Sequence, residues 1–205
     1  GKWGLADFSA RLLRRGAGGL TADALSEQID LLGASLGGSA SEDVFGVYAG
    51  GRTRHLDALL ELLARIVLQP DFPDHEVELG RRRTLAQLTN ELDDPGALAE
   101  KAMLRSVYGA HPYGHEVSGR AHSLKVLGRA ELVAFHRQQL GPRVSELYLV
   151  GDIDPPAVLK RVEHLFGRWA GGPSAAVTVP KFEQIAKPGE VVIVDKPEQT
   201  QAQVR

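Results

Sequence analysis

Residues 4–16, Gly4-Leu-Ala-Asp-Phe-Ser-Ala-Arg-Leu-Leu-Arg-Arg-Gly16, form the stretch that decides the fold. Its apolar residues recur with the spacing of one helix face, which predicts an amphipathic helix over 4–15. That buried face would consist of Leu5, Phe8, Leu12 and Leu13. On these residues alone, an ordinary packing helix explains the stretch as well as a functional motif does, because short apolar helices are common.

Several short sequence motifs follow along the chain. They are TADALSEQIDLLG (21–33), SLGGSASEDVFGVYA (35–49), LQPDFP (68–73), DDP (93–95), HPYG (111–114), Gly119 and VGDIDP (150–155). Together with Gly4, Ala6, Phe8, Leu12, Leu13 and Gly16 in the first helix, this ordered set resembles the pitrilysin/insulinase type of zinc metallopeptidase. The resemblance extends over nearly the whole chain, and within the family the chain is most similar to the branch of the mitochondrial processing peptidase.

The zinc-binding positions of that family are degenerate in this chain. The resemblance places Asp7 at the first His of the inverted motif His-x-x-Glu-His, Ala10 at the Glu and Arg11 at the second His. In active members the two imidazoles hold zinc, and the Glu takes a proton from zinc-bound water. Ala10 cannot accept a proton, and the permanently cationic Arg11 has no lone pair for a metal.

The remaining zinc positions are degenerate as well. The third ligand, a downstream Glu in the family, falls on Gln87, and the acidic residue that supports the site falls on Gly80. A neutral amide oxygen is a poor zinc ligand beside imidazole and carboxylate. The sequence therefore predicts no zinc, no other cofactor and no catalytic residue on this chain. Zinc would lie on a partner subunit.

An alternative metal site has little support in the sequence. A displaced site would combine Asp7 with one or more of the seven His residues. His111 and His115 have helical ligand spacing, but Pro112 and Gly114 lie within that stretch and favour a turn.

Composition favours a globular chain without nucleic-acid partners. The formal net charge is -2, and the run Arg81-Arg82-Arg83 follows Glu76 and Glu78, which is typical of a solvated helix face. No apolar stretch is long enough to span a membrane, and no signal peptide is visible. The compartment is unknown from the residues. Paired bacterial members of the family are exported, so the resemblance implies the periplasm, with the cytoplasm as the alternative.

The secondary structure is predicted to be mixed and rich in helices. Helices are expected over 4–15, over 53–68, 74–92, 95–107 and 129–139, and over 155–169 with Asp154 as its N-cap. A second helix is expected to begin after Thr21, which would be its N-cap. Strands are expected over 35–39, 44–50, 145–150 and 191–194. This mixture predicts an α+β fold, an antiparallel or mixed sheet layered with helices, which in the family is one half-domain.

The chain divides near a small-residue stretch after the last long helix. We expect a first half over 1–172, a linker over 173–188 and the opening of a second, similar half over 189–205. The resemblance also implies that the family would have completed one or two strands before Gly1. An isolated half would expose a large face, which favours a homodimer or docking of another half.

The resemblance implies a non-catalytic subunit that helps a zinc-bearing homologous subunit to enclose peptide. Peptides in such enzymes add as a strand to an exposed sheet edge, which here corresponds to Gly37, Gly38, Ser39, Ala40 and Ser41. Gly37 and Gly38 stand where the family has Asn-Ala. A bulge or turn is the simpler explanation of the two glycines. Two alternatives remain: a structural assembly protein of the core-protein type, and an active zinc peptidase.

Overall fold

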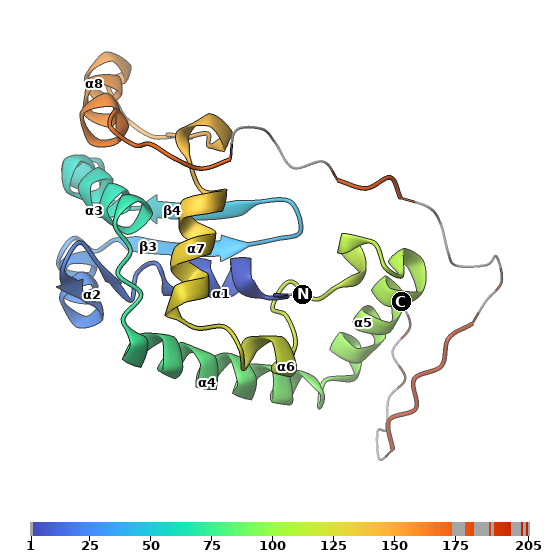
Figure 1. Ribbon diagram of the computed structural model, residues 1–205. Helices are drawn as coiled ribbons and strands as arrows, with labels where there is room; N and C mark the ends of the chain where they lie inside the picture. The colour runs from blue at the N-terminus through green and yellow to red at the C-terminus, as the bar shows by residue number, and fades with distance from the viewer. Residues whose placement is uncertain are drawn as a thin grey trace.

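The computed structural model describes residues 2–173, 179–182, 189, 191–197, 202 and 204. Helices surround a short antiparallel hairpin, so the expected α+β class is confirmed. Figure 1 shows strands β3 and β4 at the centre, with helix α1 beside them, α7 crossing them and α4 along one side. Helices α3 and α8 lie next to each other at one end of the molecule.

The first helix, α1, covers Leu5–Leu12, and Gly4 precedes it with a positive φ of 87°. A glycine is favoured there because a side chain is strained in that conformation and a Cβ would lie 2.7 Å from the Ser118 carbonyl oxygen. A two-residue hairpin and a second helix follow. Their bounds are Gly16–Ala17 (β1), Leu20–Thr21 (β2) and Ala22–Leu31 (α2). The expected cap is confirmed, because the Thr21 hydroxyl accepts the Ala24 N–H at 3.2 Å.

The central hairpin pairs β3 (Ser35–Ala40) with β4 (Phe45–Gly50), close to the expected bounds. The register places Gly37 opposite Tyr48 and Gly38 opposite Val47. Ser41 starts the connecting turn, where its hydroxyl accepts the Val44 N–H at 3.1 Å. Among the described residues each of the two sheets has only two strands, so the hairpin contributes a small antiparallel layer.

The core lies where α1, α2 and α3 meet the hairpin and where α4 packs on α1. Its largest fully buried side chains include Phe8, Leu13, Leu25, Ile66 and Phe72. The bounds are Thr53–His55 for the 3₁₀ turn η1, Leu56–Leu68 for α3 and Asp74–Glu91 for α4. The chain between α3 and α4 includes Pro70 and Pro73, as the sequence predicted for a helix stop and restart.

A second group of elements extends from α4. It comprises α5 (Pro95–Tyr108), the 3₁₀ turn η2 (Pro112–Gly114) and α6 (Ala121–Leu124). The Asp94 carboxylate caps α5 by accepting the Gly96 N–H at 2.7 Å. Tyr113 ties this group to the hairpin turn, because its hydroxyl donates to the Asp43 carboxylate at 2.7 Å.

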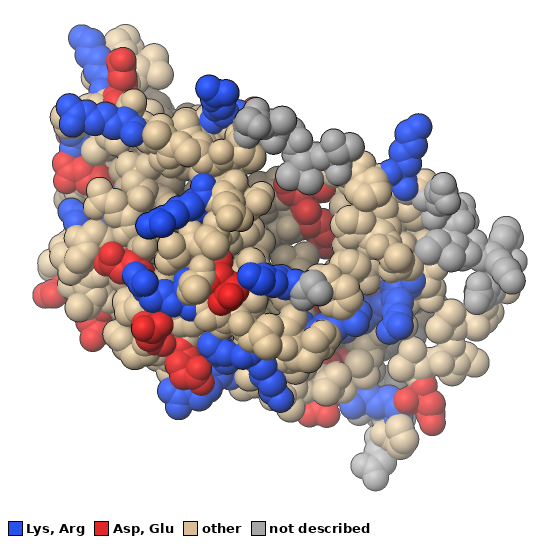
Figure 2. Space-filling model, in the orientation of Figure 1, with Lys and Arg blue, Asp and Glu red and all other residues tan. Residues whose placement is uncertain are grey.

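The run of three arginines on α4 is only partly the solvated face that the sequence predicted. Arg82 and Arg83 are exposed, but the Arg81 guanidinium donates to the Lys125 carbonyl at 2.7 Å and pairs with Glu78 at 3.1 Å. Arg81 therefore links α4 to the end of α6. Basic and acidic side chains are interspersed over the face shown in Figure 2, which fits the near-neutral net charge.

The last described helices are α7 (Arg129–Gln139) and α8 (Pro155–Phe166), with the 3₁₀ turn η3 at Pro142–Val144 between them. Asp154 occupies the N-cap position of α8, but the predicted capping hydrogen bond is absent, because the Asp154 side chain accepts no backbone N–H of α8. Among the described helices none is long and apolar enough to cross a membrane.

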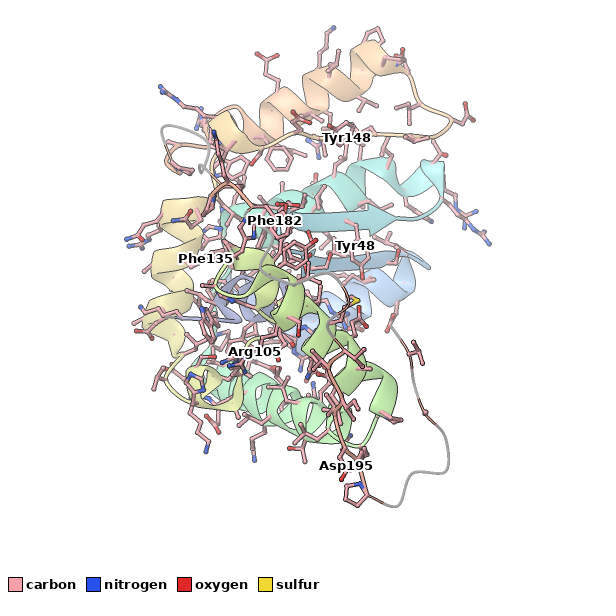
Figure 3. The ribbon with its side chains drawn as sticks, turned by 90° about the vertical axis from the view of Figure 1, so that its right-hand side faces the viewer. Tyr48, Arg105, Phe135, Tyr148, Phe182 and Asp195 are labelled. Carbon is pink, nitrogen blue, oxygen red and sulfur yellow. The ribbon has the colours of Figure 1, made fainter. Side chains whose placement is uncertain are left out.

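The two later strand predictions are wrong. Residues 145–150 and 191–194 have strand-like sequence patterns, yet neither segment pairs with a described strand. A strand requires a ladder of backbone hydrogen bonds to a neighbour, and periodicity alone does not supply one. Tyr148 is 80% exposed and Val150 fully exposed, on a segment that leads towards α8 in Figure 3.

The expected linker and second half fall mostly on parts of the chain outside the described residues. These parts are residues 174–178 and 183–188 in the linker, and 190, 198–201, 203 and 205 beyond it. Where the chain is described, its C-terminal segment runs beside α5, as Figures 1 and 3 show. There the Lys196 ammonium donates to the Leu92 carbonyl at 2.8 Å.

Candidate functional site

Helices α1 and α4 bring together the four residues that the sequence resemblance assigned to zinc-site positions. Asp7, Ala10 and Arg11 lie on α1, and Gln87 lies on α4, 76 residues after Arg11. The helices approach closely because α4 has Gly80 where the family has an acidic residue. A Cβ at Gly80 would lie 2.9 Å from Leu12 Cδ2 and 3.3 Å from Phe8 Cε2.

Arg11 is the cation of this site. Its Nε lies 2.8 Å from Asp7 Oδ2, and its Nη1 donates to Gln87 Oε1 at 3.1 Å. The contact with Asp7 is an ion pair and lacks the geometry of a hydrogen bond to that buried oxygen. The Asp7 side chain is only 8% exposed, whereas the Arg11 side chain is 43% exposed. Arg11 therefore neutralises a buried carboxylate and still faces solvent.

The site continues along α4 into α5. The Gln87 amide donates to Glu91 Oε1 at 3.0 Å, and Lys101 on α5 donates to Glu91 Oε2 at 2.9 Å. Burial by itself raises the pKa of Glu91, but the hydrogen bonds from Lys101 and Gln87 and the charges of Lys101 and Arg11 outweigh it and lower that pKa. The result is a polar chain Asp7–Arg11–Gln87–Glu91–Lys101 that joins three helices.

Ala10, the residue at the general-base position, is completely buried. Strand β3 crosses α1 here so closely that a Cβ at Gly38 would lie 2.5 Å from the Ala10 carbonyl oxygen. Ala10 has no group that accepts or donates a side-chain proton. The position therefore serves packing between α1 and β3.

These residues do not fit a zinc ion. A zinc site takes three or four ligands from thiolate, imidazole and carboxylate, and this one offers a single carboxylate, a neutral amide and a guanidinium. Within the described part of the chain, no group of three or more His, Cys, Asp or Glu residues could hold a metal. The guanidinium lies against the same carboxylate that a metal at Asp7 would use.

The His111–His115 stretch is the turn that the sequence favoured. His111 Nδ1 accepts the Tyr113 N–H at 3.2 Å, and Pro112–Gly114 forms η2. The second ring nitrogen, Nε2, lies 3.0 Å from the Pro180 carbonyl oxygen. With one nitrogen accepting and the other facing a carbonyl, both ring nitrogens of His111 already have partners in the protein.

Two residues of the expected peptide-binding edge, Gly37 and Gly38, line a groove together with Arg11, whereas Ser39, Ala40 and Ser41 do not line it. Gly37, Gly38, Ser39 and Ala40 are on β3, and Ser41 starts the turn. The family-type Asn-Ala would not fit at 37–38 without movement, since a Cβ at Gly37 would meet the Tyr48 hydroxyl at 2.7 Å and one at Gly38 the backbone of Ala10. The two glycines therefore reflect close packing within a regular strand, rather than a bulge.

Comparison with known protein families matches both parts of the chain. Residues 2–120 match the sequence model of the insulinase family, peptidase family M16. The chain belongs to the insulinase family. Residues 127–205 match a second model of the same family, described as the peptidase M16 inactive domain.

Curated relatives match most of the chain as a single stretch. An uncharacterized zinc protease of Mycobacterium tuberculosis is 27% identical over 164 residues, which are 80% of this chain and 37% of that protein. A second one, from Bacillus subtilis, is 21% identical over 180 residues, or 87% of this chain and 44% of that protein. The chain thus spans less than half the length of these relatives.

Several solved structures share the fold. A peptidase M16 inactive domain from Pseudomonas fluorescens has a TM-score of 0.77 at 24% identity, and covers 89% of this chain and 44% of its own. A protease from Helicobacter pylori has a TM-score of 0.80 at 19% identity, with 89% and 45% covered. Pitrilysin has a TM-score of 0.73 at 19% identity, with 88% of this chain and 20% of its own covered.

Two residues of the polar chain were not identified from the sequence. Glu91 follows Gln87 by one helical turn, and this spacing on a predicted helix was a usable signal. Lys101 lies on the next helix, and only the packing of α5 against the end of α4 brings it to Glu91. The resemblance suggested positions for zinc ligands, but it did not indicate which side chains contact one another there.

Proposed function

We propose that this chain is a non-catalytic member of the insulinase family that helps a zinc-bearing homologous subunit to bind and enclose peptide. The observation that carries the proposal is the contact of the Arg11 guanidinium with both Asp7 and Gln87, two positions that correspond to zinc ligands. A guanidinium repels a metal cation and has no lone pair to offer it. The proposal therefore places zinc and the proton-transfer step on the partner.

The structure also favours peptide binding over a purely structural role. Among the described residues β3 pairs with β4 alone, so its other edge has no strand neighbour. A groove of about 440 Å³ runs beside Ser35–Gly38 of that strand. An extended peptide adds to such an edge through backbone hydrogen bonds, which require no metal.

The test measures metal and activity together. Elemental analysis of the purified protein, alone and mixed with a zinc-motif homologue from the same organism, should find zinc only when the homologue is present. Peptide hydrolysis should appear in the mixture and be absent from the protein alone. Stoichiometric zinc on this chain, or chelator-sensitive hydrolysis by it alone, would overturn the proposal.

A further inference from the structure

The groove beside β3 has a basic wall. It lies between α1, the end of α2 and the hairpin, and Arg11 and Arg14 of α1 both line it. The other residues that line it are Ile29, Asp30, Ala34, Ser35, Leu36, Gly37, Gly38 and Tyr48. Two guanidinium groups thus face a lining that holds one carboxylate, Asp30, while the carboxylate paired with Arg11, Asp7, lies outside the lining.

The two guanidinium groups differ in how they are held. Arg14 is exposed and forms no ion pair with any residue in the described part of the chain. Arg11 is fixed through its Nε and Nη1 by Asp7 and Gln87, while 43% of its side chain remains exposed. Because guanidinium has five N–H donors, Arg11 has further donors available to a ligand. A fixed cation loses little conformational entropy on binding.

The floor of the groove suits an extended chain. Gly37 has no side chain, and the Tyr48 hydroxyl comes within 2.7 Å of where its Cβ would be, so the Tyr48 ring leans over Gly37. Tyr48 is 56% exposed and lies on the hairpin in Figure 3. An exposed aromatic ring beside a strand edge offers a peptide apolar contact in addition to backbone hydrogen bonds.

We infer that this groove selects extended peptide segments that carry Asp or Glu side chains, which bind Arg11 and Arg14. Carboxylate is the group that best matches guanidinium, because the two form paired, charge-assisted hydrogen bonds. The inference rests on the peptide binding of the proposed function and adds the charge of the peptide to it. Lys-bearing peptides would meet like charge above all at Arg14, because the charge of Arg11 is already paired with Asp7.

The test compares three fluorescent peptides of the same length. Each is acetylated and amidated, so that only side chains carry charge, and each has Glu, Gln or Lys at alternate positions of a Thr/Val strand sequence. Fluorescence anisotropy should show the tightest binding for the Glu peptide. Since exposed charge pairs contribute modestly, Arg14→Gln should weaken that peptide up to about fivefold and leave the Gln peptide unchanged. Raising the salt concentration should reduce the preference for Glu over Gln.

A matched control separates local from overall charge. Arg82 is an exposed arginine of α4 that does not line the groove, so Arg82→Gln removes the same charge elsewhere. It should leave the affinity for the Glu peptide unchanged. Equal loss in both variants would overturn the inference, because it would indicate a general charge effect.

The peptide series also distinguishes failure of the inference from failure of the proposed function. Equal binding of all three peptides would overturn the acidic preference and retain peptide binding. No binding of any peptide, by the protein alone or with a zinc-bearing homologue, would overturn both. Tight binding of the Lys peptide would contradict the assignment of Arg11 and Arg14 to the peptide contact.

Discussion

Arg11 and Gln87 are 76 residues apart, and a hydrogen bond of 3.1 Å from Arg11 Nη1 to Gln87 Oε1 joins them across α1 and α4. The sequence resemblance assigns both residues to expected zinc-ligand positions. The interhelical link that a shared metal would make is therefore made here by a direct side-chain contact. The same guanidinium neutralises the buried Asp7, so the site is a structural ion pair.

Removing Arg11 should destabilise the protein through Asp7. The Asp7 side chain is 8% exposed, and Arg11→Met would leave its charge without a counter-ion. Because Arg11 is partly solvated, we expect a loss of about 1–2 kcal/mol in the free energy of unfolding. The double variant Asp7→Asn/Arg11→Met should recover much of it. Urea denaturation would measure both, and equal stability of the single and double variants would contradict the ion pair's role.

Three substitutions should create a zinc site. Asp7→His, Arg11→His and Gln87→Glu together place two imidazoles one helical turn apart on α1 and a carboxylate within reach on α4. The triple variant should bind zinc at one ion per chain by elemental analysis, and zinc should raise its melting temperature. Ala10 stays unchanged, because a Glu there would have to be buried against β3. Variants with only two of the three changes serve as controls, and failure of the folded triple variant to bind zinc would contradict the register.

Gly38 should tolerate no side chain. Its Cβ would lie 2.5 Å from the Ala10 carbonyl oxygen, which belongs to helix backbone and cannot move without shifting α1. Gly38→Ala should therefore cost about 1–3 kcal/mol of stability. Gly46→Ala is the matched control on β4, where the Cβ would lie 3.9 Å or more from its neighbours. Thermal unfolding of both would check this, and an equal effect would rule out close packing as the cause.

Acid should weaken the link between α4 and α5. The pKa of Glu91 is lowered in the folded state, so its contribution to stability is complete above the ordinary value of 4.5 and is lost as pH falls below it. Glu91→Gln should reduce stability near neutral pH by about 0.5–1 kcal/mol. The difference from the parent protein should shrink as the pH is lowered through that window. Urea denaturation at several pH values would measure it, and a difference independent of pH would contradict the charge pairing with Lys101.

Local elements were largely predictable because their signals lie within a few residues. The stretch 129–139 was predicted with the bounds that α7 has, and Thr21 caps α2 as its residue type indicates. Asp154, with the same kind of signal, occupies the N-cap position without making the bond, because a cap needs side-chain geometry that sequence does not fix. Strand predictions were less accurate than helix predictions: residues 145–150 have strand-like composition, yet no described strand pairs with them.

The sequence by itself predicted the family and most of the helices, because both depend on residue types and spacing along the chain. By resemblance, it also assigned Asp7, Arg11 and Gln87 to expected zinc-ligand positions. Only the tertiary structure decided what these side chains contact. Packing of α1 on α4 brings Arg11 to Gln87, and packing of α5 brings Lys101 to Glu91. Such contacts depend on how α1 packs against its neighbours, which is set by close approaches such as Gly38 of β3 against Ala10 and Gly80 of α4 against Leu12.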